Sequence, residues 1–203
     1  MDKKNIAILL FDDVDLLDVA GPFEVFSVTA ALNKGDLCSV FTVAQQNRSI
    51  RTWSGYSVNP AYTFADCPPP HLFLIPGGIG TRAEMKKPAV IAWIQETAAK
   101  AELVLSVCTG ALLLAQAGLL DGLEATTHHQ VMEELRGIAP STRLHTDRRY
   151  VDNGRLITSA GIAAGIDMAL YVVSRLFGEE QATKVAGYME YDWSKPQREA
   201  ASA

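Results

Sequence analysis

The chain has 203 residues, of which 48% are hydrophobic and 20% charged, and its formal net charge at pH 7 is −5. This balance is typical of one compact domain over residues 1–203, and the net negative charge argues against a surface that follows nucleic-acid phosphates. The three cysteines, Cys38, Cys67 and Cys108, are widely spaced and odd in number. That pattern indicates a reducing compartment, without a disulfide framework or a metal site.

The N-terminus, MDKKNIAILLF, places two lysines before an apolar run, as a signal peptide does. The acidic pair Asp12-Asp13 ends the run and no small-residue cleavage site follows, so residues 5–11 are predicted to form the first buried strand. No apolar segment reaches the roughly 18 to 20 residues that a membrane span needs. We therefore expect a cytoplasmic protein without a membrane partner.

Asp18 lies shortly before Gly21 and Pro22, and proline is favoured in the first turn of a helix. The pattern predicts a helix from Pro22 to about Asn33, with Asp18 in the loop that leaves the first strand. In that position Asp18 has two possible roles, as an acidic group of a site or as a cap of the helix after Gly21.

The next segment of the chain carries strand and turn signals. We expect a strand over 37–44, then a hairpin at the sheet edge between Ser49 and Thr63 around Trp53-Ser54-Gly55. Three prolines lead into a strand over 71–75, which ends at Pro76-Gly77-Gly78, and a helix over 88–100 follows. The backbone N–H groups of Gly77 and Gly78 are free of side-chain bulk, so a ligand could approach them; a plain tight turn is the alternative.

The segment ELVLSVCTGALLLAQAGLL, residues 102–120, joins a short apolar run to an Ala/Leu-rich stretch at a single cysteine. It predicts a strand over 103–107 and a helix over 110–116, with Cys108 and Thr109 in the sharp turn between them. A helix N-terminus favours the thiolate form of a cysteine, and Gly110 allows a tight bend. Cys108 is therefore predicted to be a nucleophile.

The remaining third of the chain continues the alternation of strands and helices. We expect a helix over 130–136, a hairpin over 150–157 with an Asn-Gly turn, a long helix through Asp167 to Leu176, and a C-terminal part, 178–203, with one short helix and a polar tail that frays. The alternation predicts an α/β fold with a doubly wound, mostly parallel sheet and helices on both faces. Asp18, Gly78 and Cys108 each follow a strand, so we expect them at the carboxyl edge, where such sheets bind ligands.

Five motifs in order resemble the DJ-1/PfpI superfamily, and among its branches the isonitrile hydratases most: LLDVAGP, FADCPPP with IPGG, SVCTGALLLAQAGLLDG, ATTH, and ITSAGIAAGID. The resemblance covers most of residues 5–177, which we take as the core. It implies a flavodoxin-like fold of the class I glutamine amidotransferase-like type, a homodimer, and a small-molecule substrate.

The resemblance also assigns roles. Cys108 would be the nucleophile and Asp18 its acidic partner, and Gly77, Gly78 and Thr109 would present backbone N–H groups to developing charge. Ile162 would lie beside the cysteine. His128 matches a histidine common to several branches of the superfamily, and a structural role is the alternative. Thr109 replaces the histidine that follows the cysteine in peptidase-like members.

On physical grounds Asp18 is most useful when protonated, because an ionised carboxylate would raise the pKa of the neighbouring thiol. We expect Cys108 to attack an isonitrile carbon while Asp18 protonates it, after which water activated by Asp18 releases an N-substituted formamide. No cofactor or metal is needed. A glyoxalase-like enzyme for small aldehydes and a non-enzymatic redox or ligand-sensing domain remain open. The three tryptophans, Trp53, Trp93 and Trp193, are expected to be packing residues.

Overall fold

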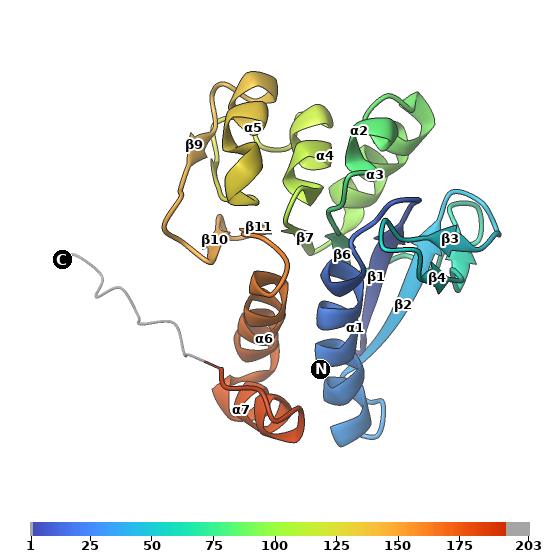
Figure 1. Ribbon diagram of the computed structural model, residues 1–203. Coiled ribbons are helices and arrows are strands. Elements are labelled where there is room, and N and C mark those ends of the chain that lie inside the picture. Colours follow the sequence, from blue (N-terminus) through green and yellow to red (C-terminus); the bar gives the residue numbers. More distant parts are fainter. Residues whose placement is uncertain (1, 194–203) are drawn as a thin grey trace.

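The computed structural model describes residues 2–193 and is built around a seven-stranded sheet with the strand order β10-β11-β7-β6-β1-β2-β5 (Figure 1). Its strands are β1 (Lys4–Leu10), β2 (Cys38–Ala44), β5 (Tyr62–Thr63), β6 (Leu72–Ile75), β7 (Leu103–Val107), β10 (Tyr150–Asp152) and β11 (Leu156–Ser159). All neighbours pair in parallel except β10 and β11. Two further pairs stand apart from this sheet: β3 (Ile50–Arg51) with β4 (Ser57–Val58), and β8 (Glu124–Ala125) with β9 (Arg143–Leu144).

Helices cover both faces of the sheet (Figure 1). One face carries α1 (Leu16–Leu32), α6 (Ala164–Phe177) and α7 (Glu179–Tyr188). The other carries α2 (Thr81–Glu84), α3 (Pro88–Lys100), α4 (Gly110–Gln116) and α5 (Met132–Ile138), with a 3₁₀ turn, η1 (His129–Val131), leading into α5. The prediction of an α/β, flavodoxin-like, mostly parallel sheet with helices on both faces is therefore confirmed.

The central strands are buried on both faces, as their continuous apolar runs predicted. Every residue of β6 and β7 is buried, and Phe73 and Leu105 are fully enclosed. Each such side chain stabilises the fold by about 1.5–3 kcal/mol relative to the exposed state. The sheet therefore gives a rigid base for the loops that leave its strands.

The register of the strands brings three of these loops together. Leu10, the last residue of β1, lies opposite Ala44, while Ile75 of β6 lies opposite Ser106 of β7. The β1–α1 loop, the Gly77–Gly78 turn after β6 and the turn after β7 consequently emerge side by side at the carboxyl edge. The predicted convergence of these loops at one edge is what the structure has.

The helix predicted from Pro22 begins earlier than expected, and this is a correction. Helix α1 begins at Leu16, so Asp18 lies in its first turn rather than in a loop, and Pro22 lies inside the helix. The Pro22 ring lacks the N–H that would bond the Asp18 carbonyl. Burial of both Pro22 and Phe26 keeps the helix continuous despite this loss, because tertiary packing outweighs local propensity. The alternative that Asp18 caps a helix after Gly21 is excluded.

The hairpin predicted between Ser49 and Thr63 is present as β3 and β4, and β5, at the end of the same segment, forms the edge of the central sheet as expected. Strands β3 and β4 pair only with each other, and the described edge strands of the central sheet are β5 and β10. The hairpin instead rests on the β1–α1 loop, where Asp13 N–H donates to the Arg51 carbonyl and Trp53 N–H to the Val14 carbonyl. Its tip is thereby placed beside the carboxyl edge.

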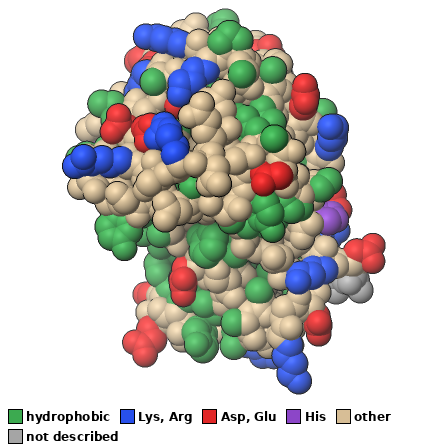
Figure 2. All heavy atoms as spheres, turned by 90° about the vertical axis from the view of Figure 1, so that its right-hand side faces the viewer, with side chains coloured by type: hydrophobic (Ala, Val, Ile, Leu, Met, Phe, Trp, Pro, Cys, Tyr) green, Lys and Arg blue, Asp and Glu red, His purple; other side chains and the backbone are tan. Residues whose placement is uncertain are grey.

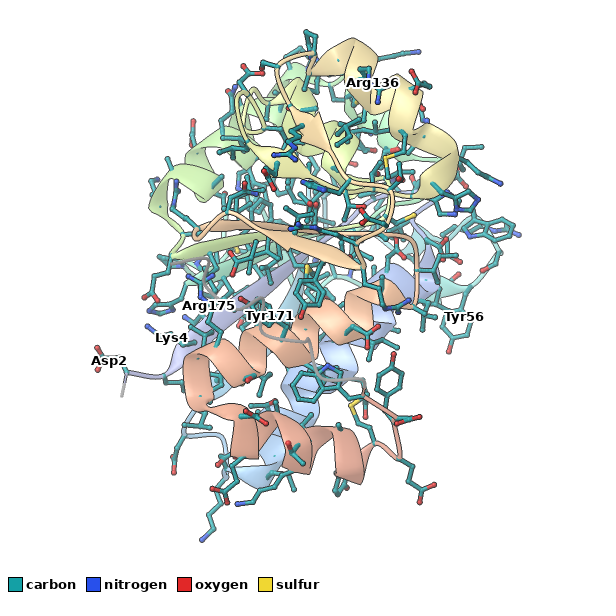
Figure 3. The ribbon with its side chains drawn as sticks, turned by 90° about the vertical axis from the view of Figure 1, so that its left-hand side faces the viewer. Asp2, Lys4, Tyr56, Arg136, Tyr171 and Arg175 are labelled. Carbon is teal, nitrogen blue, oxygen red and sulfur yellow. The ribbon has the colours of Figure 1, made fainter. Side chains whose placement is uncertain are left out.

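Helix α6 is fastened to the β10–β11 hairpin by a polar cluster. Asp152 accepts hydrogen bonds from the Tyr171 hydroxyl at 2.6 Å and from the Arg175 guanidinium at 3.0 Å. Tyr171 and Arg175 lie together on the side of α6 that Figure 3 shows. This cluster ties α6 to the hairpin whose second strand, β11, leads into the segment that contains Ile162.

The remaining predictions for the C-terminal half differ little from the structure. The helix predicted over 130–136 is divided into η1 and α5, and the Asn-Gly hairpin and the long helix are present as expected. The predicted short helix is α7, whereas the predicted frayed tail lies outside the described residues. Within residues 2–193 no helix combines the length and the apolar character that a membrane crossing requires.

Candidate active site

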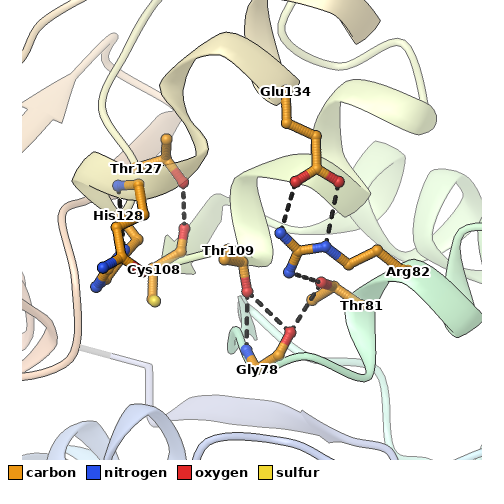
Figure 4. Close-up of polar contacts among 9 residues, drawn as sticks. Gly78, Thr81, Arg82, Cys108, Thr109, Thr127, His128 and Glu134 are labelled. Carbon is orange, nitrogen blue, oxygen red and sulfur yellow. Dashed lines mark hydrogen bonds and ion pairs between the residues drawn. The ribbon is translucent and has the colours of Figure 1, made fainter.

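Cys108 lies at the strained turn between β7 and α4, as predicted. Its φ is +55°, a left-handed conformation that costs a non-glycine residue free energy and is found at functional turns. Its backbone N–H donates to the carbonyls of Ser159 and Ala160, at 3.2 and 3.1 Å. Its carbonyl accepts the Thr127 hydroxyl at 2.7 Å (Figure 4). Two other segments of the chain, at Ser159–Ala160 and at Thr127, therefore hold the backbone of Cys108 in place.

Glycine at position 110 allows this turn to lie against β6. A Cβ atom at Gly110 would lie 2.2 Å from the carbonyl oxygen of Ile75, a distance at which the backbones would have to move apart. The tight approach places Cys108 directly beside the turn that follows β6.

Asp18 is fully buried and faces the cysteine. Its Oδ2 accepts the Gly77 N–H at 2.9 Å, while its Oδ1 has no regular hydrogen-bond partner among the described residues and the Cys108 thiol interacts with the same carboxyl. Burial, and then the charge of Asp15, raise the pKa of Asp18 to about 7. Asp18 is therefore substantially protonated at neutral pH.

The thiol of Cys108 does not have the lowered pKa that its position before α4 suggested. Burial, and then the charge of Asp18, raise its pKa to about 12, against the smaller opposing effect of the Thr109 and Ile162 backbone N–H groups. Helix α4 has only seven residues, and Cys108 is 4% exposed, so desolvation outweighs the helix terminus. At neutral pH the pair is therefore a thiol next to a carboxyl group that is about half protonated.

The backbone N–H groups are distributed differently from the expectation. The Gly78 N–H donates to Thr109 Oγ1 at 2.8 Å, and the same hydroxyl donates to the Gly78 carbonyl at 3.0 Å (Figure 4), so this N–H is not free for developing charge. The N–H groups that reach the sulfur belong to Thr109 and Ile162. Ile162 has a φ of +47° and lies beside Cys108 as expected.

His128 lies in the same site, and its ring has partners that were not foreseen. Its Nδ1 accepts the Gln130 N–H at 3.3 Å, and the ring packs over Gly161 and beside the ring of His129. Burial and then His129 lower the pKa of His128, which keeps the ring neutral. With Nδ1 accepting, the proton of the neutral ring is assigned to Nε2.

A pocket of about 440 Å³ opens above the sulfur, within the range of roughly 300–1,000 Å³ that is usual for sites of drug-sized ligands. Of the predicted residues it is lined by Cys108, Gly78, Thr109, His128 and Ile162, while Asp18 and Gly77 lie behind its wall. Six further lining residues were not predicted as site residues: Asp15, Trp53, Ile79, Arg82, Gln130 and Val131.

Two of these additional residues define the mouth of the pocket. Trp53, at the tip of the β3–β4 hairpin, is 62% exposed, so its prediction as a packing residue is wrong. Arg82 is paired with Glu134, its Nε lying 3.1 Å from Oε1 (Figure 4). The sequence signal that was available for this wall is weak: an aromatic turn in a hairpin and an arginine shortly after the paired glycines.

The described residues hold no cluster of three or more histidine, cysteine or acidic side chains suited to a metal ion. Their fold and site define an α/β protein with a buried cysteine on a strained strand-to-helix turn. A carboxyl group from α1 interacts with the thiol of this cysteine. Residues 4–175 match the DJ-1/PfpI family. The chain belongs to this family.

Known relatives fall into different functional classes. The chain is 35% identical to an isonitrile hydratase of Pseudomonas putida over 95% of its own length and 80% of that protein. It is 25% identical to the HTH-type transcriptional regulator GbdR of Pseudomonas aeruginosa, covering 94% of this chain and 52% of the regulator. A crystal structure of a ThiJ/PfpI family protein from Pseudomonas syringae superposes with a TM-score of 0.85 at 29% identity, over 98% of this chain and 79% of that one.

Proposed function

We propose that the protein is a cysteine-dependent hydratase that converts an isonitrile into an N-substituted formamide. The observation that carries the proposal is the buried pair of Cys108 and Asp18, in which the pKa of the carboxyl group is raised to about 7. An isonitrile carbon must gain both a nucleophile and a proton at the same atom, and this pair provides both. The similarity to an isonitrile hydratase supports the same substrate class.

The first step adds the S–H group across the isonitrile carbon. The Sγ–C bond forms as Asp18 gives its proton to that carbon and takes up the thiol proton, so the carboxyl group ends as it began. The product is a covalent thioimidate, R–N=CH–S–Cys. Water then adds to the C=N bond, and cleavage of the C–S bond releases R–NH–CHO and restores the thiol.

The Thr109 and Ile162 N–H groups face the sulfur and stabilise the negative charge that develops on it as its proton leaves. Because the thiol itself has a raised pKa, its reaction depends on this transfer of a proton to Asp18. The pair therefore acts as a unit.

The size of the pocket favours isonitriles with a bulky substituent over small aldehydes, and its charge disfavours anionic substituents. A volume of about 440 Å³ far exceeds that of a three-carbon aldehyde. Arg82 is neutralised by Glu134, which leaves the acidic Asp15 without a charged partner among the lining residues. We expect neither a cofactor nor a nucleic acid to take part, and propose a cytoplasmic homodimer.

The test follows formamide formation from an aryl isonitrile by absorbance. Wild-type protein is expected to convert the isonitrile to the formamide. The Cys108→Ala and Asp18→Ala variants should be slower by at least about 100-fold, the range for loss of a nucleophile or a general acid. Cys67→Ala is the matched control, since Cys67 does not line the pocket, and it should keep full activity. Turnover that survives in Cys108→Ala contradicts the mechanism.

The two open alternatives are tested with the same protein. Consumption of methylglyoxal with lactate formation would favour a glyoxalase-like enzyme. Selective oxidation of Cys108 by mild peroxide, detected by intact mass, without turnover of either substrate would favour a redox sensor. The raised pKa of the Cys108 thiol works against that oxidation, since the thiolate is the reactive form.

A further inference from the structure

The hydration step of the proposed reaction needs a base that meets water in the pocket, and Asp18 is badly placed for it. Asp18 is fully buried, its Oδ2 is occupied by the Gly77 N–H, and it is not among the pocket-lining residues. Its remaining oxygen, Oδ1, is buried, and the carboxyl group interacts with the Cys108 thiol. A water molecule that approaches a thioimidate from the open pocket therefore meets other groups first.

His128 lines the pocket but does not supply a base. Its Nδ1 is already an acceptor for the Gln130 N–H, and in the neutral ring the other nitrogen, Nε2, then carries the proton. Nε2 can donate a hydrogen bond and cannot accept one. The guanidinium of Arg82 has no acceptor at all. Among the lining residues this leaves one carboxylate, that of Asp15.

Asp15 stands at the N-cap position of α1, where an aspartate ordinarily accepts a hydrogen bond from the first turn of its helix. Here the side chain makes no such bond and lines the pocket instead. An acidic side chain that leaves the helix N-terminus uncapped and lies in a pocket above a cysteine is available for water or substrate.

The backbone of Asp15 is held firmly beside the site. Its N–H donates to the Gly77 carbonyl at 2.9 Å. Gly78 has a φ of +127°, and a Cβ atom there would lie 2.6 Å from the Asp15 nitrogen, so this contact needs glycine. The charge of Asp15 is close enough to raise the pKa of both Asp18 and Cys108. Asp15 is thus positioned by the same turn that positions Asp18.

We infer that Asp15 is a second catalytic residue, the general base that activates water against the thioimidate. This inference rests on the proposed hydratase function. Asp15 takes one proton from water as the water oxygen bonds to the thioimidate carbon, and the C=N electron pair moves to nitrogen, which receives that proton. Asp18 carries the second proton from the new hydroxyl group to the sulfur as the C–S bond breaks. Asp15 thereby activates water, and Asp18 transfers protons to and from the sulfur.

Intact-mass measurement during turnover of an aryl isonitrile tests the assignment. In Asp15→Asn the first step should proceed and the second should slow, so turnover falls at least tenfold and most of the protein carries an adduct with the mass of one isonitrile. Asp18→Asn and Cys108→Ala should carry no adduct. Asp13→Asn removes the same charge two residues earlier, outside the pocket, and should behave as wild type.

Each other result overturns the assignment in a distinguishable way. Unchanged turnover in Asp15→Asn shows that Asp15 is not the base. Reduced turnover without an adduct places Asp15 in the first step, acting only through the charge that it exerts on Asp18. If wild-type protein shows neither turnover nor adduct, the hydratase function itself fails, and the role of Asp15 falls with it.

Discussion

At the scale of single residues, the proposed chemistry depends on a carboxyl group whose pKa is raised mainly by burial. Asp18 is fully buried, with the Gly77 N–H as its one regular donor, and this burial favours the protonated form of the carboxyl group. A cysteine enzyme that relies on a thiolate needs the opposite arrangement, with positive charge near the sulfur. Cys108 has Asp18 instead, so in the proposed mechanism proton transfer within the pair replaces prior ionisation of the thiol.

This arrangement predicts the sign of the pH dependence. Because the reactive form contains protonated Asp18, with a pKa of about 7, kcat/KM for an isonitrile should be constant well below pH 7 and fall about tenfold per unit well above it. Stopped-time assays between pH 5 and pH 9 measure this profile. A rate that rises through this range would show that the thiolate is the reactive species.

The same burial predicts an effect on stability. The folded-state pKa of about 7 lies above the ordinary value of 3.8, so the folded state holds this proton more tightly, and the resulting stabilisation is full below about pH 4 and lost as pH rises through 7. At pH 8.5, Asp18→Asn should therefore raise the free energy of unfolding, by up to about 4 kcal/mol at about 1.4 kcal/mol per pKa unit.

Urea unfolding of both proteins at pH 4 and pH 8.5 measures this difference. At pH 4 the variant should show no such gain, because Asp18 is neutral in the folded wild type. An equal effect at both values would mean that lost or gained packing, not charge, decides the stability at this position.

At the scale of elements, the site is made by turns that approach one another more closely than side chains allow. A Cβ atom at Gly77 would lie 2.5 Å from Thr109 N and 2.8 Å from Asp18 Oδ2. The turn after β6, the turn after β7 and the start of α1 thus fit together only with glycine here. Whether each segment forms a helix or a strand was predictable from local patterns, whereas this close fit depends on three segments that are distant in the sequence.

Gly77→Ala should destabilise the protein by about 1–3 kcal/mol, the usual cost of overpacking, and should lower activity because it separates Asp18 from Cys108. Gly137→Ala is the matched control. Gly137 lies in α5 with open space around its missing Cβ, so alanine should stabilise its helix by about 0.5–1 kcal/mol. Thermal unfolding and turnover of the two variants separate the effects; equal behaviour would contradict the close fit.

The β3–β4 hairpin forms one wall of the pocket through Trp53. Replacing Trp53 with alanine should raise KM for an aryl isonitrile about fivefold, corresponding to about 1 kcal/mol of aromatic contact, with little change in kcat. Tyr56→Ala is the control, because Tyr56 is on the same hairpin and equally exposed but does not line the pocket. Steady-state kinetics of both variants decide whether this wall contacts substrate.

At the scale of the whole molecule, the surface carries apolar side chains that the described fold does not cover. Leu17, Tyr56 and Tyr188 are 41%, 63% and 67% exposed. On the face that Figure 2 shows, hydrophobic side chains gather around the middle of the molecule and between its charged groups. Exposed apolar area is common where proteins associate when it is contiguous.

The homodimer implied by the family resemblance is therefore retained as a prediction. Sedimentation equilibrium at micromolar concentration should give twice the mass of one chain. Replacing Leu17 by lysine tests whether this exposed residue of α1 takes part, and should shift the equilibrium toward the single chain. A single-chain mass for the wild type across the accessible concentration range would exclude the dimer.

Much of this protein is determined by its sequence read locally. Continuous apolar runs identify β1, β6 and β7, because strands buried on both faces have no polar alternation, and the Ala/Leu-rich stretch after Cys108 identifies α4. The order of these elements predicts a parallel sheet, and a parallel sheet places the ends of its strands at one edge. Cys108, Gly78 and Asp18 could therefore be expected to meet there before any contact was known.

Only the tertiary structure decided the chemical state of these groups and the residues around them. The pKa of Asp18 depends on how completely other segments exclude water, and the start of α1 depends on packing that offsets Pro22. Trp53 and Asp15 enter the site because a separate hairpin and an uncapped helix end lie beside the turn after β6. Solvent exclusion and contacts between distant segments are properties of the folded chain, which local sequence patterns do not record.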